Sequence, residues 1–336
     1  MVVKNDMKQI ESIPTNITTS TIDKPFNCVS VIIASKNGLH HLKDCLPSVL
    51  KAVQKAPFET EIIVVDDNST DNTLIELPNS FPQIKIIKNK KMGVCSARNT
   101  GVANSTGDWL FFADNDVFLE EDFFVKAQKY LKEDVFCVSC CGYLASEPTR
   151  QLDGLKKLAW KRGSMRFTGN IYNQQLKENK IYPSFGVQGA YFFCNKNRFI
   201  TLSGFDEDLL EPYMLEETDL MYRGLKRGWK IVYAADTHPL HKCGGTIQSK
   251  TNKRTLFLSK RNSLIFTWKN ITSTRLLLSS LLWCALRPNF KVFKEVINAW
   301  PIITKKRAIE KANQVVSDMD LLKQNNKLVE SILNDK

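Results

Sequence analysis

Short apolar runs alternate with helix-spaced segments through the first part of the chain. The runs that predict strands fall at residues 29–33, 61–65, 84–87 and 109–113, and helical spacing falls at residues 40–56, 73–77 and 96–104. Strands that alternate with helices over so short a stretch predict an α/β fold with a mostly parallel sheet. Later apolar runs at residues 191–194 and 230–234 predict two more strands.

Carboxylates follow two of the predicted strands. Asp66 and Asp67 end the second run, and Asp114 and Asp116 end the fourth. Because the carboxyl ends of parallel strands share one edge of a sheet, these side chains are expected to converge on one crevice. Asp66 and Asp67 also suit a simple turn. Asp114 and Asp116, one residue apart, can hold a hard divalent cation such as Mg²⁺ together with substrate phosphates.

The composition is that of a globular protein with an ample core. The 336 residues are 43% hydrophobic and 24% charged, which suits one large domain with an appendage or two domains. No run of 18 apolar residues predicts a membrane-spanning helix. The nine cysteines are scattered and lack zinc-finger spacing, so we interpret them as core residues rather than metal ligands. Reduced thiols and the absence of an apolar leader segment lead us to expect a cytoplasmic location.

The net charge of +12 is concentrated near the end of the chain. Residues 250–336 hold 17 Lys+Arg and 6 Asp+Glu, whereas residues 1–249 are almost balanced. A regional excess of this kind indicates an anionic partner, or else a solubilising surface.

An apolar segment lies inside this basic region. Residues 276–286 read LLLSSLLWCAL, which is too short to span a bilayer, and Arg275 and Arg287 flank them. The pattern is typical of a helix that lies in a membrane interface, and the alternatives are a packing appendage or a dimer interface in a homo-oligomer. Residues 308–333 are expected to form one amphipathic helix.

Several ordered segments carry a family resemblance. VSVIIASKNG, EIIVVDDNSTDNT and GVCSARNTGVANSTGDWLFFADNDVF are followed by GFDEDL, EETDLMYRGLKRGWKIVYAADTHPLHK and KRNSLIFTWKN. Over roughly residues 27–270 the chain resembles the nucleotide-sugar domain of a family-2 glycosyltransferase. The resemblance implies a GT-A fold, which is Rossmann-like with a mostly parallel mixed sheet, and inverting transfer from a UDP- or dTDP-sugar with Mn²⁺ or Mg²⁺. We expect a flexible tail at residues 1–26, a GT-A domain at 27–249, and a basic, helical, membrane-associating region at 250–336.

The resemblance also implies how the donor is bound. Asp67 matches the residue that reads the edge of a pyrimidine base, and Ala34 and Ser35 would lie beside that base. Arg98 matches a position on the nucleotide side, where its charge would face the diphosphate; a surface salt bridge is the alternative. Asp114 would face the ribose and a metal-bound water.

Further matches imply the metal site and the general base. Asp116 and His241 would be metal ligands, and an imidazole ligand suits Mn²⁺ better than Mg²⁺. Glu217 matches the base that deprotonates the acceptor hydroxyl, with Glu216 as the fallback. Both acids also suit the first turn of a helix, where the dipole favours negative charge.

The remaining expectations concern the acceptor. Gln188, Gly189 and Ala190 match the region that lines the pocket for the donor sugar and the acceptor. We expect transfer to a hydroxyl of a glycan or lipid-linked acceptor in cell-surface polysaccharide synthesis, at the inner face of the membrane. The alternatives are a non-catalytic GT-A-fold protein that binds membrane or nucleic acid, and a sugar nucleotidyltransferase. The paired carboxylates disfavour the first alternative, the thin Lys36-Asn37-Gly38 loop disfavours the second, and no nucleic-acid module is recognisable.

Overall fold

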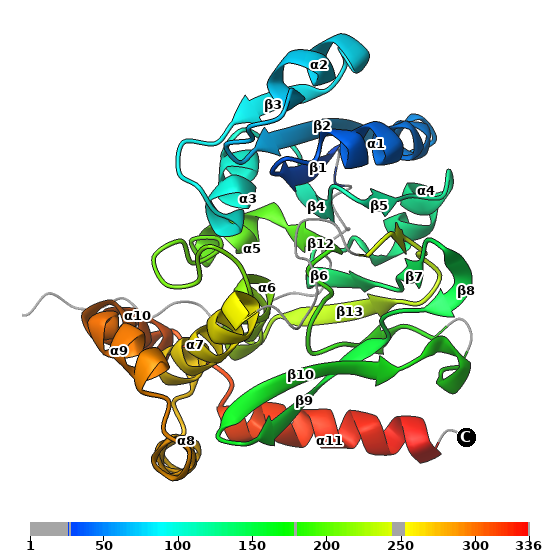
Figure 1. The fold of residues 1–336 in the computed structure, drawn as a ribbon. Coiled ribbons are helices and arrows are strands. Elements are labelled where there is room, and N and C mark those ends of the chain that lie inside the picture. Colours follow the sequence, from blue (N-terminus) through cyan, green and yellow to red (C-terminus); the bar gives the residue numbers. More distant parts are fainter. Residues whose placement is uncertain (1–25, 27, 178–179, 244–252, 335–336) are drawn as a thin grey trace, which may run out of the picture.

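An eight-stranded sheet lies at the centre of the structure, which is a computed structural model that describes residues 26, 28–177, 180–243 and 253–334 (Figure 1). All but the last residue of the expected tail at 1–26 lies outside these described residues. The strand order is β11-β13-β6-β12-β4-β1-β2-β3. The strands are β1 (Cys28–Ser35), β2 (Glu59–Asp66), β3 (Lys85–Lys88), β4 (Trp109–Asp114), β6 (Val135–Cys140), β11 (Tyr182–Pro183), β12 (Tyr191–Asn195) and β13 (Lys230–Ala234).

Strand β1 sits between β2 and β4, and all three run parallel. Strand β12 is antiparallel to both β4 and β6, so the sheet is mixed but mostly parallel, as predicted. The register places Asp66 beside Ser35 and Asp114 beside Ala34. The carboxylate-bearing ends of β2 and β4 therefore meet at one edge of the sheet, as the sequence predicts.

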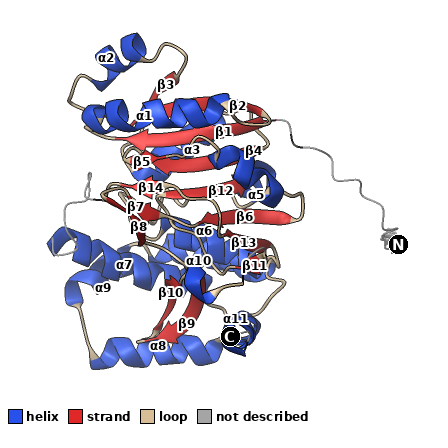
Figure 2. Ribbon diagram, turned by 90° about the vertical axis from the view of Figure 1, so that its right-hand side faces the viewer, coloured by secondary structure: helices blue, strands red, loops and turns tan. Residues whose placement is uncertain are grey.

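Helices cover both faces of this sheet (Figure 2). They are α1 (Leu39–Gln54), α2 (Thr73–Ser80), α3 (Val94–Ala103), α4 (Phe123–Ala127), α5 (Lys196–Thr201) and α6 (Glu216–Lys226), with short 3₁₀ turns at Gln128–Tyr130 and Asn173–Gln175. Successive side chains of β4 point to opposite faces of the sheet and so belong to two different hydrophobic cores. Trp109 and Phe111 face the core that α1 and α4 cover, whereas Leu110 and Phe112 face the core that α3 and α6 cover.

Two smaller sheets extend the fold. The first has the order β5-β14-β7-β8, and the second is a hairpin of β9 and β10. Their strands are β5 (Val117–Phe118), β7 (Tyr143–Leu144), β8 (Glu147–Gln151), β9 (Leu155–Lys161), β10 (Ser164–Ile171) and β14 (Leu240–His241).

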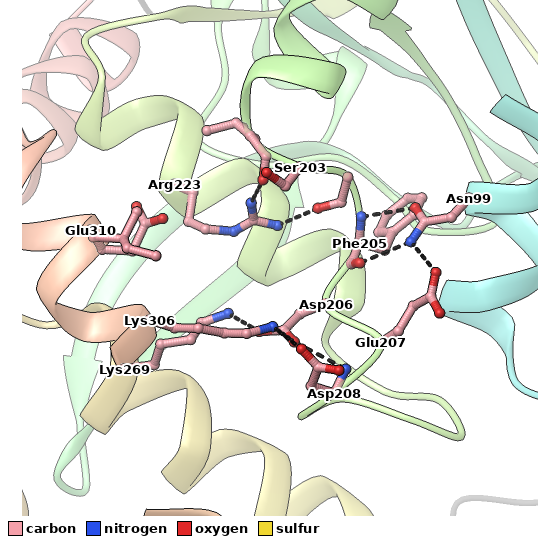
Figure 3. Close-up of a pocket in the computed structure, with 13 residues that line it drawn as sticks. Asn99, Ser203, Phe205, Asp206, Glu207, Asp208, Arg223, Lys269, Lys306 and Glu310 are labelled. Atoms are coloured by element: carbon pink, nitrogen blue, oxygen red, sulfur yellow. Dashed lines mark hydrogen bonds and ion pairs between the residues drawn. The ribbon is translucent and has the colours of Figure 1, made fainter. Parts of the chain in front are cut away.

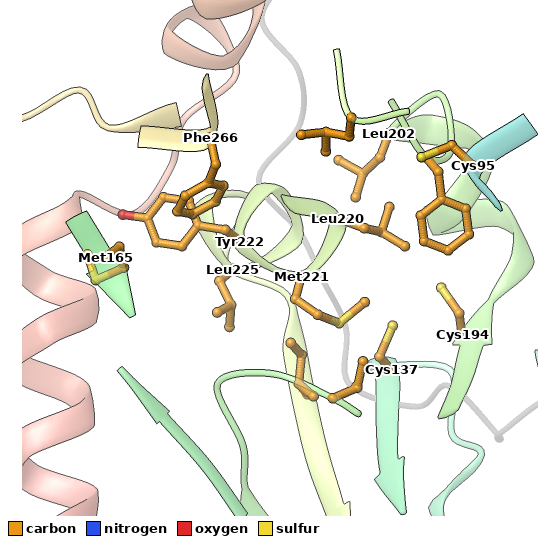
Figure 4. Close-up of a cluster of buried hydrophobic side chains, with 14 of the residues drawn as sticks. Cys95, Cys137, Met165, Cys194, Leu202, Leu220, Met221, Tyr222, Leu225 and Phe266 are labelled. Carbon is orange, nitrogen blue, oxygen red and sulfur yellow. The ribbon is translucent and has the colours of Figure 1, made fainter. Parts of the chain in front are cut away.

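Five helices complete the described chain: α7 (Lys253–Asn270), α8 (Thr274–Leu286), α9 (Phe290–Asn298), α10 (Trp300–Ala312) and α11 (Asp318–Asn334). They share a hydrophobic core with α3 and α6. In Figure 4, Phe266 of α7 lies against Tyr222 of α6, and the two ring centroids are 5.4 Å apart. Among the described residues, none of the helices combines the length and apolarity needed to cross a bilayer.

One helix expectation was wrong. Residues 308–333 do not form a single helix, because the chain breaks between α10 and α11. The backbone N–H groups of Val315 and Val316 both donate to the Lys226 carbonyl at the end of α6. Ser317 then starts α11, since its Oγ accepts from the Asp320 backbone and donates to the Asp320 carboxylate.

A charged network ties α7 and α10 to the loop before α6 (Figure 3). Lys269 Nζ lies 2.6 Å from an Asp206 oxygen and 2.7 Å from an Asp219 oxygen, and its side chain is only 1% exposed. Lys306 from α10 also pairs with Asp206, at 2.6 Å. A cavity of about 370 Å³ lies here, but none of Asp114, Asp116, His241 and Glu217 lines it. Because both lysines are already paired, we assign the cavity to the packing of the helices rather than to a ligand.

Candidate active site

Asp114, Asp116 and His241 form the one cluster of metal-ligating side chains found among the described residues. Their ligand atoms all lie within 4.8 Å of one another. Asp116 is 5% exposed and its Oδ1 lies 3.1 Å from His241 Nε2, while the Asp114 side chain is 42% exposed. Two carboxylate oxygens and an imidazole nitrogen are a donor set that suits Mn²⁺ or Mg²⁺.

The pairing of short strands explains how His241 lies next to Asp116, although the two residues are far apart in the sequence. Strand β14 pairs with β5, which places His241 opposite Val117. The Lys242 backbone N–H also donates to the Asp116 carbonyl at 3.1 Å. His241 is therefore fixed beside the Asp-x-Asp turn by backbone hydrogen bonds.

Asp116 and His241 each favour the charged form of the other. Burial opposes ionisation of Asp116, but the hydrogen bond and charge from His241 outweigh burial and lower the Asp116 pKa. Burial likewise opposes protonation of His241, and Asp116 outweighs it and raises the His241 pKa. The contact with His241 therefore compensates the burial of the Asp116 carboxylate.

Arg98 of α3 joins the Asp-x-Asp turn to the start of α6. One guanidinium nitrogen, Nη2, donates to Asp114 Oδ1 at 2.9 Å and to the Gly189 carbonyl at 2.8 Å. The other, Nη1, donates to Glu216 Oε1 at 3.2 Å. The side chain is 3% exposed, so the alternative of a surface salt bridge does not apply. Arg98 therefore links Asp114, segment 188–190 and Glu216 through hydrogen bonds from one buried side chain.

Helix α6 buries every residue except Glu217. Figure 4 shows Leu220, Met221 and Tyr222 of this helix inside the hydrophobic cluster. Glu216 is buried as well; burial and the neighbouring Glu217 charge raise its pKa to about 7, against the opposing charge of Arg98. One Glu216 oxygen has no hydrogen-bond partner. Of the two acids, Glu217 is the one that solvent reaches.

The chain enters α6 through an unusual turn. Met214 and Leu215 both have positive φ, at 87° and 69°, which is uncommon for residues with large side chains. Asn262 of α7 stabilises this turn, because its side-chain amide donates to the carbonyls of Tyr213 and Met214 at 3.0 and 2.9 Å. Backbone strain that neighbouring structure holds in place is common at functional sites.

Gly189 lies directly against Glu217. A Cβ atom at Gly189 would come within 3.2 Å of the Glu217 carboxyl carbon, so a larger residue would crowd that side chain. The Ala190 carbonyl accepts from the Asp114 backbone at 2.8 Å, and Gln188 Oε1 accepts from Lys156 at 3.2 Å. The segment 188–190 therefore runs between the metal-ligating turn and Glu217.

The expected base-binding residues lie at the adjoining edge of the sheet. Asp67 is 8% exposed, and its carboxylate accepts from the Gly93 backbone at 3.0 Å and from the Asn89 amide at 2.8 Å. Ser35 is buried and its hydroxyl accepts from Asn115 at 2.8 Å, while Ala34 is half-buried. These contacts fix the edge next to Asp114.

Sequence reasoning missed a polar group beside the metal-ligating cluster. Asp153 accepts from Tyr191 Oη at 2.8 Å and pairs with Lys156 at 2.9 Å. The Tyr191 ring lies edge-on to His241, with centroids 5.9 Å apart. The Asp153-Gly154 turn signal could have drawn attention to this segment, but nothing in the local pattern connects it to His241.

Comparison with known proteins identifies the family. A sequence model of Glycosyl transferase family 2 matches residues 30–198, half of the chain. This protein belongs to glycosyl transferase family 2. The matched segment includes Asp67, Arg98 and the Asp-x-Asp turn.

Relatives of this family 2 glycosyltransferase match only parts of their own length. It is 32% identical over 108 residues to the glycosyltransferase GlyA of Streptococcus pneumoniae, which covers 31% of this chain and 15% of GlyA. It is 28% identical over 174 residues to an uncharacterized glycosyltransferase of Rickettsia conorii, which covers 51% of this chain and 27% of that protein. The chain thus spans less than a third of the length of these two relatives.

A solved structure supports the fold. The structure of GalNAc-T7 with UDP, GalNAc and Mn²⁺ matches 75% of this chain and 50% of its own, with a TM-score of 0.58 and 17% identity. At this identity the likeness establishes the GT-A fold alone. The family and fold expected from the sequence motifs are both confirmed.

Proposed function

We propose that this glycosyltransferase moves a sugar, with inversion at the anomeric carbon, from a UDP- or dTDP-sugar to a hydroxyl of a glycan or lipid-linked acceptor. The observation that carries the proposal is Glu217, the one accessible residue of an otherwise buried helix. Arg98 connects its neighbour Glu216 to Asp114. Segment 188–190 contacts both the proposed base and the proposed cation-binding turn, and the donor sugar would bind beside this segment.

In this mechanism the Glu217 carboxylate takes the proton of the acceptor hydroxyl. The acceptor oxygen forms a bond to the anomeric carbon as the bond from that carbon to the diphosphate oxygen breaks. The nucleoside diphosphate leaves with the electron pair. Glu216, whose pKa is raised to about 7, is the fallback for the base.

Asp114, Asp116 and His241 would hold Mn²⁺ or Mg²⁺, which supplies the neutralisation of charge on the departing diphosphate. Asp67, with Ala34 and Ser35 beside it, would bind the pyrimidine base. These donor-side roles rest on the family motifs and on the shared sheet edge.

We further propose that the enzyme acts in cell-surface polysaccharide synthesis, at the inner face of the membrane. The GT-A domain would occupy residues 27–249, and the basic helical region after it would bring the site to a membrane-borne acceptor. The distribution of the +12 charge supports this arrangement.

A donor screen tests the proposal. The protein is incubated with Mn²⁺ and each of several nucleotide sugars, and the released nucleoside diphosphate is measured with and without acceptor glycans. Glu217→Gln and Asp116→Ala should each reduce transfer by about 10³-fold while the fold is retained. Glu121→Gln, which changes an exposed carboxylate paired with Lys55, is the matched control and should leave transfer unchanged. Substantial transfer by the Glu217 variant would overturn its role, and no release from any donor would overturn the proposed function.

A further inference from the structure

Helix α8 presents an apolar face to solvent. Four of its leucines are more than half exposed: Leu278 at 60%, Leu281 at 52%, Leu282 at 61% and Leu286 at 70%. Phe290, at the start of α9, is 82% exposed. Of the eighteen large hydrophobic side chains exposed in the described part of the chain, nine lie between Leu278 and Ile309. Isolated exposed leucines are ordinary, but a cluster of this kind marks an interaction surface.

The side of α8 that faces the protein is narrow and carries Leu276 and Ser280. Ser280 is fully buried, and its hydroxyl accepts from the Trp268 indole of α7 at 3.2 Å. Ser279 accepts from the Trp160 indole of β9 at 3.2 Å. Gly163, in the turn between β9 and β10, lets the hairpin approach α8 closely, because a Cβ there would lie 2.7 Å from Trp283 Cβ. The helix thus buries one leucine and one serine while four leucines stay exposed, which is far more apolar exposure than a surface helix in water usually shows.

The charge around this face has one sign. Arg275, Arg287, Lys291 and Lys294 flank it and are all exposed. The sequence contains no Asp or Glu between Asp236 and Glu295. Arg287 also lies over the Trp283 ring, 4.7 Å from its centroid, at the end of the helix. Leucine, tryptophan and phenylalanine rimmed by arginine and lysine are typical of helices that lie in the interface of an anionic membrane.

From these features we propose that α8 and the first turn of α9, residues 274–294, form a surface that binds a bilayer containing anionic phospholipids. Figures 1 and 2 both show α8 at the lower end of the molecule, where a flat surface can reach it. A second copy of the chain is a poorer occupant, because a symmetric contact through this face would bring the same four cations together. The inference deepens the proposed function, on which it rests for the membrane-borne acceptor, but vesicle binding can be measured without any activity.

The test is co-sedimentation of the full chain with vesicles of phosphatidylcholine alone or of phosphatidylcholine with phosphatidylglycerol. We expect binding to the anionic vesicles, weakened by added salt because the surface cations are screened. The double variant Leu282→Glu with Leu286→Glu should bind at least tenfold more weakly. Phe290→Glu, a change at the most exposed of these side chains, should weaken binding in the same direction.

A matched control changes apolar residues elsewhere on the surface. Leu74→Glu with Ile75→Glu alters two exposed positions on α2, at 38% and 69%, and should bind as the wild type does. Equal binding by the α8 and α2 variants would overturn the proposal, as would wild-type binding without preference for anionic lipid, or no binding. Sedimentation of a wild-type dimer that the α8 variant dissociates would assign the face to a second copy instead.

Nucleotide release by the wild-type protein is measured in parallel, without vesicles. Release without vesicle binding would refute the membrane surface and leave the proposed function intact. Vesicle binding without release from any donor would refute the proposed function and leave the membrane surface intact.

Discussion

Arg98→Lys is the substitution that tests the organisation of the site most directly. The guanidinium is almost fully buried and donates to three acceptors that come from three different parts of the fold: Asp114, Glu216 and the Gly189 carbonyl. Lysine keeps the charge, so the buried Glu216 and the partly exposed Asp114 are not left without a cation. Its single ammonium group cannot reproduce the planar fork that reaches all three acceptors.

The magnitude follows from the lost hydrogen bonds. If lysine retains one charged contact, it loses one hydrogen bond to a carboxylate, about 1.5–3 kcal/mol, and one to a carbonyl, about 0.5–1.5 kcal/mol. The sum is about 2–4.5 kcal/mol. If the whole loss falls on the transition state, kcat/KM decreases by about 30-fold to 2000-fold.

The assay measures kcat and KM for nucleotide release, together with the free energy of unfolding in urea. A positioning role predicts that kcat falls, because Asp114 and the start of α6 lose their common anchor. Arg150→Lys is the matched control, since Arg150 is 63% exposed and lies 3.8 Å from Glu147. A variant within twofold of wild type in kcat/KM would refute the reasoning. A change confined to the donor KM would show instead that Arg98 contacts the diphosphate.

Two further predictions concern buried charges away from the metal-ligating cluster. Lys269→Met should lower the free energy of unfolding by about 3–5 kcal/mol in urea, because it leaves Asp206 and Asp219 buried with less compensation, whereas exposed Lys305→Met should change it by less than about 0.5 kcal/mol. Burial opposes ionisation of both aspartates, but Lys269 and Lys306 outweigh it at Asp206, and Lys269 and Arg223 outweigh it at Asp219, so both pKa values are lowered. The stabilisation that these carboxylates provide is present above the unfolded-state pKa of about 4 and is lost as the pH falls further, so the cost of Lys269→Met should shrink in acid. Burial raises the Glu211 pKa to about 7, so the free energy of unfolding of the wild type falls as the pH rises from about 4.5 to 7. Glu211→Gln should therefore raise the melting temperature more at pH 8 than at pH 5. An equal shift at the two pH values would contradict this reasoning.

Much of the fold was predictable because its signals are local. The run at 29–33 became β1, and the helical spacing at 40–56 became α1, each within a few residues of the expected bounds. Parallel strand order then placed the ends of β2 and β4 together, which is a property of the topology rather than of any side chain. The break between α10 and α11 was not predictable in this way, since it depends on hydrogen bonds to the Lys226 carbonyl, more than eighty residues earlier.

The candidate site also has features that local sequence patterns do not predict. The motif containing Arg98 predicts a position on the nucleotide side, but the burial of this side chain depends on acceptors from β4, α6 and segment 188–190. A single arginine in a short helix carries no periodic signal for such a convergence. The contrast between Glu216 and Glu217 was equally hidden, because two adjacent acids look alike in sequence and differ here only in which direction α6 turns them.

The basic region has two physical roles that its charge count alone does not separate. Lys269 and Lys306 form internal ion pairs with Asp206, whereas Arg275 and Arg287 are exposed around the leucines of α8. The internal pairs, and Asn262, connect α7 and α10 to the chain that leads into α6. The C-terminal helices therefore support the position of Glu217 as well as presenting a surface. Truncation after residue 270 would remove part of the shared core along with α8, so it would abolish activity and membrane binding together. Only substitutions on the exposed face of α8 can separate the two, because they leave the buried lysines and the core in place.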